Sequence, residues 1–187
     1  MSEILQKICF STKDPRTLPM DSITQITWHP EQRLNFGVTS FDGFFRIYKI
    51  FPHSNSSEFT LSYFFKYPYP LTCFCFIKQS NLVLIGTAEG KVILIDLSSS
   101  NEPNFEYMVV QSFSSAIQRI YTSDSPKLII CIDMSITIKI FNMTEFKVVQ
   151  EISLKEEIQD SDFKFPLLIV ALSNNKLFIL DLNHPNK

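Results

Sequence analysis

The sequence predicts an all-β protein, a β-propeller built from four copies of one sheet. Three observations lead to this prediction: short apolar runs with period-two alternation, poor helical spacing throughout, and recurrence of the same unit along the chain. Each unit has an apolar run, a short polar turn and a second alternating run. We expect a single domain over residues 1–187, with blades over about 22–66, 70–113, 116–154 and 158–182.

The units end alike, in an aromatic or aliphatic residue, a polar residue and an aliphatic one. These endings are Tyr48-Lys49-Ile50, Ile95-Asp96-Leu97, Phe141-Asn142-Met143 and Leu180-Asp181-Leu182. Successive endings, at residues 50, 97, 143 and 182, are 47, 46 and 39 residues apart, near the length of a WD-type blade. Only Asp96 and Asp181 keep the acid of the Trp-Asp signature, and the tryptophan is absent from all four. The sequence therefore predicts degenerate WD repeats.

In the first unit, runs rich in Ile, Val, Phe, Thr and Tyr predict successive strands. They are Ile23–Trp28, Leu34–Thr39, Phe44–Ile50 and an outer strand at Phe59–Lys66. Turns are expected at Pro30-Glu31 and at Asp42-Gly43, where glycine allows a tight hairpin.

The later units repeat this plan, with the equivalent hairpin turns at Glu89-Gly90, Ser135-Ile136 and Asn174-Asn175. Outer strands are expected at Phe105–Phe113 and Phe146–Leu154. The last unit has no outer strand of its own. A strand over Ile4–Phe10 could pair with Lys176–Asp181, supply that strand and close the ring. Closure by four blades, and a fragment or shortened form of a seven-bladed ring, both remain open.

Composition excludes several classes of protein. The chain is 45% hydrophobic and 19% charged, with a formal net charge of −2. This balance supports a folded core and gives no basic patch for direct nucleic-acid binding. No apolar run approaches the roughly 18 to 20 residues of a membrane span. The beginning of the chain does not resemble a secretory signal, so we expect the nucleus and the cytoplasm.

Residues with reactive side chains do not form a recognisable catalytic pattern. The four glycines include no phosphate-binding loop, and the three histidines are scattered in or beside predicted turns. Cys73 and Cys75 would share one face of a strand, but a zinc site needs four ligands. Asp160 and Asp162 are more simply outward residues of a strand. We expect no enzyme, no cofactor and no metal; the alternative of another class is an enzyme with a central propeller pocket.

Apolar side chains at turn tips are better candidates, because binding surfaces often include exposed aromatic residues. Phe41, in the first Asp-Gly turn, is the clearest of them. Local packing over its own hairpin is an equally weighted interpretation.

Several motifs resemble one pair of families. Ser40-Phe41-Asp42-Gly43, followed by Phe45–Lys49, resembles the Ser-Trp-Asp-Gly turn and next strand of the first blade in the Bub-type mitotic checkpoint propeller and in the messenger-RNA export propeller of the nuclear pore. The segment from Pro70–Cys73 through Ile85–Gly90 is closer to the checkpoint branch. The tail, Leu168–Pro185, resembles the fourth blade of both.

The resemblance implies a seven-bladed WD-repeat ring that acts as a protein-binding scaffold. It would bind a short segment of a checkpoint kinase or kinetochore scaffold across one face and recruit the kinase to kinetochores. The turn tryptophans that line this face correspond to Phe41 and Met134, and Asp42 belongs to the same surface. The export branch implies instead an mRNA-export adaptor that binds a nucleoporin at the nuclear pore.

Overall fold

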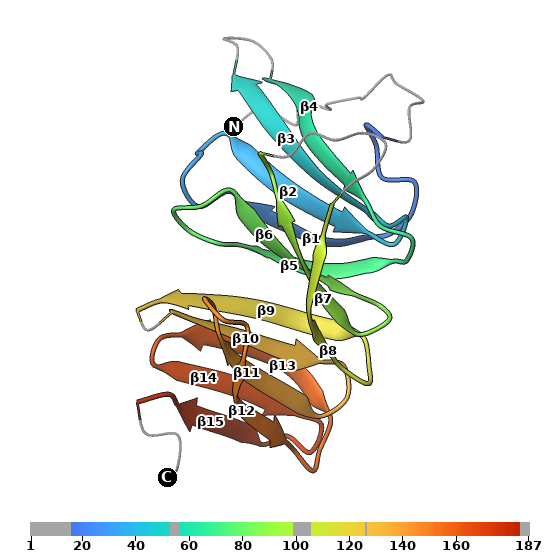
Figure 1. Cartoon of the computed structure of the whole chain (residues 1–187). Helices are drawn as coiled ribbons and strands as arrows, with labels where there is room; N and C mark the ends of the chain where they lie inside the picture. The colour runs from blue at the N-terminus through green and yellow to red at the C-terminus, as the bar shows by residue number, and fades with distance from the viewer. Residues whose placement is uncertain (1–15, 53–56, 99–105, 126, 184–187) are drawn as a thin grey trace, which may run out of the picture.

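Four antiparallel sheets make up the structure, a computed structural model that describes residues 16–52, 57–98, 106–125 and 127–183. Within these residues every regular element is a β-strand, and no helix is present that could span a membrane. The sheets follow one another along the chain, which confirms the all-β prediction of four successive blades (Figure 1).

Blade 1 has four strands in sequence order. They are β1 (Ile23–Trp28), β2 (Asn35–Ser40), β3 (Phe44–Pro52) and β4 (Ser57–Lys66). Alternating Phe, Ile and Tyr residues place one apolar set on each side of β3, so both faces of this sheet have residues to bury.

Blades 2 and 3 repeat the same order. Blade 2 contains β5 (Leu71–Phe76), β6 (Leu82–Thr87), β7 (Lys91–Asp96) and β8 (Met108–Ser112). Blade 3 contains β9 (Ile117–Asp124), β10 (Lys127–Asp133), β11 (Thr137–Asn142) and β12 (Val148–Ser153). The strand β12 starts later than predicted because Phe146, with a φ of 53°, belongs to the turn before it.

Blade 4 has three strands within the described residues: β13 (Ile158–Lys164), β14 (Leu167–Leu172) and β15 (Leu177–Asp181). The predicted outer strand over Ile4–Phe10 lies outside the described residues. Its pairing with β15 therefore stays a prediction.

Register is the same in all four blades. The second and third strands pair as Gly37 with Ile47, Leu84 with Leu94, Ile130 with Ile140, and Ile169 with Ile179. Cross-strand partners in an antiparallel sheet point to the same face. Each of these pairs therefore lies on the same face of its blade. In blades 1 to 3 this face packs against the next blade along the chain. We call it the forward face in all four blades, and the opposite face the rear face.

The core lies between the sheets. Aromatic side chains such as Phe45 and Phe74 fill the space between blades 1 and 2, and aliphatic ones such as Ile140 and Leu168 fill that between blades 3 and 4. The cluster between blades 2 and 3 includes the buried thiols of Cys73 and Cys131. Burial of these apolar side chains is the main force that joins one blade to the next.

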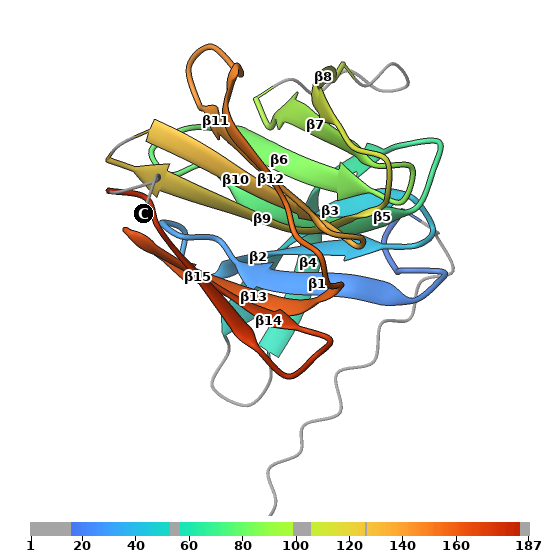
Figure 2. The ribbon, with the colours of Figure 1, turned by 90° about the horizontal axis from the view of Figure 1, so that it is seen from below.

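The first strand of each sheet is its inner strand. β5 packs against β1 and β2, and β9 packs against β5 and β6. Blade 1 and blade 4 lie at opposite ends of the resulting stack (Figure 1). The view along the stack shows that successive sheets are rotated relative to one another (Figure 2).

Candidate protein-binding rim

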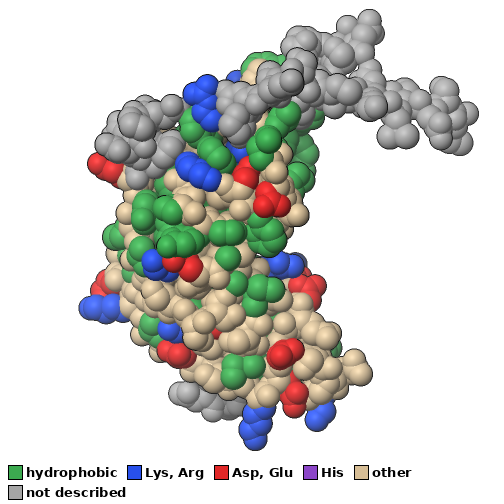
Figure 3. All heavy atoms as spheres, turned by 90° about the vertical axis from the view of Figure 1, so that its right-hand side faces the viewer, with side chains coloured by type: hydrophobic (Ala, Val, Ile, Leu, Met, Phe, Trp, Pro, Cys, Tyr) green, Lys and Arg blue, Asp and Glu red, His purple; other side chains and the backbone are tan. Residues whose placement is uncertain are grey.

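The tight turns between the second and third strands lie on one side of the molecule. We call this side the turn rim and define it by residues 41–43, 88–90, 134–136 and 173–175. The connections that lead into each blade end on the same side, because the inner strand runs antiparallel to the second strand. Hydrophobic side chains lie among charged ones on the side shown in Figure 3.

One backbone hydrogen bond fixes the first turn residue in every blade. The amide of Phe41 donates to the carbonyl of Ser22, and that of Met134 donates to the carbonyl of Ala116. Ala88 and Ser173 make the same bond in blades 2 and 4. Phe41 and Met134 are therefore structurally equivalent residues two blades apart.

Both side chains are open to solvent. Phe41 is 45% exposed and Met134 is 57% exposed. The structure thus brings the two sequence-predicted apolar residues to one rim, where a partner could reach them.

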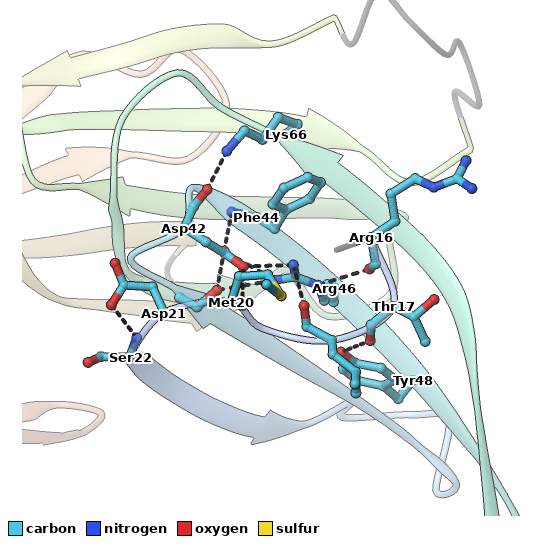
Figure 4. Close-up of polar contacts among 12 residues, drawn as sticks. Arg16, Thr17, Met20, Asp21, Ser22, Asp42, Phe44, Arg46, Tyr48 and Lys66 are labelled. Carbon is cyan, nitrogen blue, oxygen red and sulfur yellow. Dashed lines mark hydrogen bonds and ion pairs between the residues drawn. The ribbon is translucent and has the colours of Figure 1, made fainter. Parts of the chain in front are cut away.

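The Asp42 side chain, unlike those of Phe41 and Met134, makes hydrogen bonds to neighbouring groups of the protein (Figure 4). Oδ2 accepts hydrogen bonds from the Met20 amide at 2.9 Å and from Arg46 Nη2 at 2.8 Å. Oδ1 accepts the Phe44 amide at 3.0 Å and the hydroxyl of Ser40. The carboxylate therefore organises the hairpin, and Phe41 offers the larger contact area to a partner.

Arg46 lies at the centre of this network. Its side chain is 0% exposed, and its guanidinium donates hydrogen bonds to several acceptors. Besides Asp42, the guanidinium donates to the carbonyls of Arg16 at 2.9 Å and Leu18 at 3.1 Å. Sequence analysis missed this role of Arg46. The signal was a lone arginine between the apolar residues Phe45 and Ile47, four residues after an aspartate.

The network sets the protonation of Asp42. Burial by itself would raise the pKa of this carboxyl group, but hydrogen bonds from Arg46, Ser40 and the amides of Met20 and Phe44 outweigh it and lower the pKa to about 2. The turn therefore carries a fixed negative charge at neutral pH that is neutralised locally by Arg46. The Lys66 ammonium donates to the carbonyl of Asp42 and adds positive charge beside the turn.

Tyr69 is a second rim residue that sequence analysis missed. It is an exposed residue in the connection between blades 1 and 2, and its ring centroid lies 6.0 Å from that of Tyr67. Tyr67 is buried and donates its hydroxyl proton to Glu89 in the next turn of the rim. The alternation of tyrosine and proline over residues 67–70 was the available signal, because such segments expose aromatic rings on a stiff backbone.

A cavity also opens among the inner strands of the blades. It has a volume of about 600 Å³ and lies between the inner strands β1, β9 and β13. Arg119 and Asp160 face each other there at 3.4 Å, with side chains that are 45% and 69% exposed. Among the described residues, no group of three or more His, Cys, Asp or Glu side chains is placed to hold a metal ion.

Comparison with known proteins identifies the fold. No protein-family model matches the sequence, and no curated protein matches it. The structure is similar to that of the computationally designed Ika4 protein, with a TM-score of 0.67 and 13% identity over 87% of this chain and 92% of that one. It is also similar to the C-terminal WD40 domain of Sif2, with a TM-score of 0.63 and 16% identity over 85% of this chain and 57% of that one.

The WD40 β-propeller domain of Doa1 is a third similar structure, with a TM-score of 0.67 and 14% identity over 84% of this chain and 50% of that one. The chain thus has the fold of a WD40 β-propeller and spans about half the length of these two WD40 chains. At such low identity the likeness concerns the fold alone.

Proposed function

We propose that this chain is a non-catalytic protein-binding scaffold whose partner lies across the turn rim. The observation that carries the proposal is the exposure of Phe41 and Met134 at equivalent turn positions two blades apart. Two apolar side chains on one rim can flank the apolar side of a short peptide, while backbone groups of the turns between them fix its direction.

The central cavity supports this proposal over an enzyme. Its facing charges, Arg119 and Asp160, are both partly exposed, so water screens them. Catalytic acids and bases are instead usually held in partly desolvated sites.

The partner that we propose is a short segment of a checkpoint kinase or kinetochore scaffold, which the chain would recruit to kinetochores. The sequence resemblance of the first two blades to the checkpoint propeller supports this choice, together with the apolar rim. Such a role places the protein in the nucleus and the cytoplasm. A nucleoporin segment, as in mRNA export, is the alternative partner, and the binding experiment includes it.

The test measures binding of synthetic peptides from a checkpoint kinase and from a nucleoporin to the 187-residue chain by titration calorimetry. We expect Phe41→Ala and Met134→Ala each to weaken binding of the checkpoint peptide, with Phe41→Ala costing about 2 kcal/mol, or roughly 30-fold in affinity. Val149→Ala is the matched control, because Val149 is an exposed apolar residue on the outer strand β12.

Each variant is first compared with the parent by circular dichroism and thermal unfolding, so that affinities refer to equal folded fractions. If the parent and both rim variants bind the checkpoint peptide with equal affinity, Phe41 and Met134 do not form the binding site. Preference for the nucleoporin peptide would replace the checkpoint role with the export role. Binding of neither peptide would overturn both partner assignments.

A further inference from the structure

The forward faces of blades 1 to 3 are all covered by the rear face of the following blade. In blade 3 the covered face contains Ile130 and Ile132 on β10 and Ile138 and Ile140 on β11, and all four are buried. Their partners come from blade 4, for example Leu168 and Val170. In blade 3, these alternating isoleucines on the second and third strands therefore form a face that the next blade covers.

Blade 4 carries the same set at the same register. Ile169 pairs with Ile179 as Ile130 pairs with Ile140. Ala171 and Leu177 form the next pair, in the places of Ile132 and Ile138. Here, however, the side chains are open, and Ile169 and Ile179 are 40% and 58% exposed. The forward face of blade 4 is thus built like a blade-to-blade interface but lacks a covering sheet among the described residues.

The opposite end of the stack shows the complementary feature. Ile26 pairs with Val38 and Trp28 pairs with Phe36, so both β1 side chains lie on the rear face of blade 1. They are 60% and 59% exposed. In the junctions between blades 1 and 2 and between blades 2 and 3, the inner strand of the following blade packs against the inner and second strands of the preceding one. Among the described residues, the strand β1 is therefore an inner strand that no preceding blade covers.

These two ends do not meet within one molecule. Blade 1 and blade 4 lie at opposite ends of the stack (Figure 1), and β1 makes no extensive contact with β13, β14 or β15 in the described structure. Part of the rear face of blade 1 is already covered by residues 16–20, whose backbone accepts hydrogen bonds from Arg46 and Tyr48. The open part is the inner strand and the neighbouring exposed side chain of Met20.

We infer that two copies of this chain associate head to tail, with the forward face of blade 4 in each copy packed against β1 of the other. The occupant of each apolar end is thus a second copy, and the contact continues the series of interfaces that already joins blades 1 to 4. The inference concerns the ends of the stack and is independent of the partner proposed for the turn rim.

Polar groups beside the apolar face fit this arrangement. Within the chain, the Gln25 side-chain amide donates to the carbonyl of Phe74, and the Tyr121 hydroxyl donates to the carbonyl of Ser161. These inner-strand side chains each clasp the inner strand of the following blade. Asp160 and Asp162 occupy the corresponding positions of β13, opposite Ala171 and Ile169. Oδ1 of Asp160 already accepts from Arg119 and the Ser161 amide, and Oδ1 of Asp162 accepts from the Phe163 amide. In each carboxylate, Oδ2 is the oxygen that an inner strand of the second copy would meet.

The dimer closes because each joint is formed twice. Each chain contributes four sheets, so two copies related by a two-fold axis would together form a ring of eight blades. Once the first joint has formed, the second is intramolecular, and its effective concentration favours the closed dimer over an open chain of subunits.

The test is the mass of the 187-residue chain in solution, measured by light scattering after size exclusion and by sedimentation over a range of concentrations. We expect a species of twice the monomer mass of 21.7 kDa. Ile179→Asp on blade 4 and Ile26→Asp on blade 1 should each weaken the dimer about tenfold or more. Val149→Asp, which adds the same charge to an exposed apolar position on β12, should leave it unchanged.

Mixing the two variants gives the decisive measurement. In a head-to-tail dimer of Ile179→Asp with Ile26→Asp, both substitutions fall in one joint and the other joint is unaltered. The mixture should therefore form a heterodimer under conditions in which each variant alone is monomeric. Leu177→Lys is a second blade 4 variant, for use if Ile179→Asp fails the circular dichroism check.

Three results would overturn the inference. The first is a parent chain that stays monomeric at all accessible concentrations. The second is a dimer that is lost in Ile179→Asp but retained in Ile26→Asp, since this pattern indicates contact between two blade 4 faces. The third is a mixture of the variants that remains monomeric, which would exclude two separate joints.

Discussion

At the residue scale, the pair of Asp42 and Arg46 shows how an ionic group can be kept inside a small β-sheet protein. The guanidinium is removed from water, and such a transfer is costly unless every donor finds an acceptor. Here two backbone carbonyls, the Ser40 hydroxyl and the Asp42 carboxylate supply acceptors. The pair also ties the segment before blade 1 to the first hairpin.

Replacing Arg46 with Met should therefore be strongly destabilising. The variant leaves the Asp42 carboxylate without its cation and the carbonyls of Arg16 and Leu18 without these donors. We expect the free energy of unfolding to fall by about 3 kcal/mol or more, measured by urea denaturation. Arg33→Met, at an exposed position between β1 and β2, should change it by about 0.5 kcal/mol or less. Similar losses for both would contradict the role given to Arg46.

The pKa of Asp42 makes this contribution dependent on pH. In the folded state the pKa is about 2, below the ordinary value of 3.8. A lowered folded-state pKa stabilises the protein above the unfolded pKa, and this contribution is lost as the pH falls from about 4 to about 2. The stability difference between the parent and Asp42→Asn should thus be largest above pH 5 and shrink toward pH 2. Urea denaturation across this range measures it, and a constant difference would refute the assignment.

At the element scale, one residue with a positive φ shapes the hairpin turn in each of blades 1, 2 and 4. Gly43 has a φ of 80°, and Gly90 has a φ of 82° in the equivalent turn. A Cβ on Gly43 would lie 2.5 Å from the carbonyl oxygen of Tyr67, which belongs to the backbone of the next connection. Both the torsion angle and the space therefore require glycine at this turn.

Gly43→Ala should lower the free energy of unfolding by about 2 kcal/mol, because the turn or the Tyr67 backbone must shift. The equivalent residue of blade 4, Asn175, has a φ of 62°, and Asn175→Gly removes strain there. That variant should be neutral or slightly stabilising. Thermal unfolding of both variants measures the contrast, and a harmless Gly43→Ala would show that the turn adapts freely.

The strands and turns were predictable because they depend on neighbours in sequence. Alternation gave β1 with its observed bounds, and Asp42-Gly43 predicted the first hairpin. The binding of Asp42 to Arg46 and to the Met20 amide was not predictable in this way, since it depends on which face of β3 the arginine occupies. The apolar forward face of blade 4 is visible in the sequence. The uninterrupted apolar run of β14 is typical of a strand with both faces covered.

At the scale of the whole molecule, the interface between blades 2 and 3 buries two thiols in one cluster. Cys73 and Cys131 are fully buried and free of disulfides. Burial raises the pKa of Cys73 to about 12 and that of Cys131 well above its ordinary value. Both thiols are therefore protonated in the folded protein and shielded from reagents.

The two thiols should become reactive only when the blades separate. In a background with Cys9→Ser and Cys75→Ser, proteins that keep either Cys73 or Cys131 should react with Ellman's reagent at the same rate. That rate should equal the rate of global unfolding, measured by fluorescence. Faster labelling of one thiol would show that a blade opens by itself.

Every strand of the described sheets pairs with its neighbour in sequence, and this has a consequence for how the chain folds. Most strands are joined to the next by short loops, so the entropy lost in forming each sheet is small and most contacts are local. A chain that leaves the ribosome can complete one blade before the next is synthesised. The next blade can then fold against the apolar face of the finished one. The order of synthesis thus matches the order of packing, and few incorrect strand pairings compete.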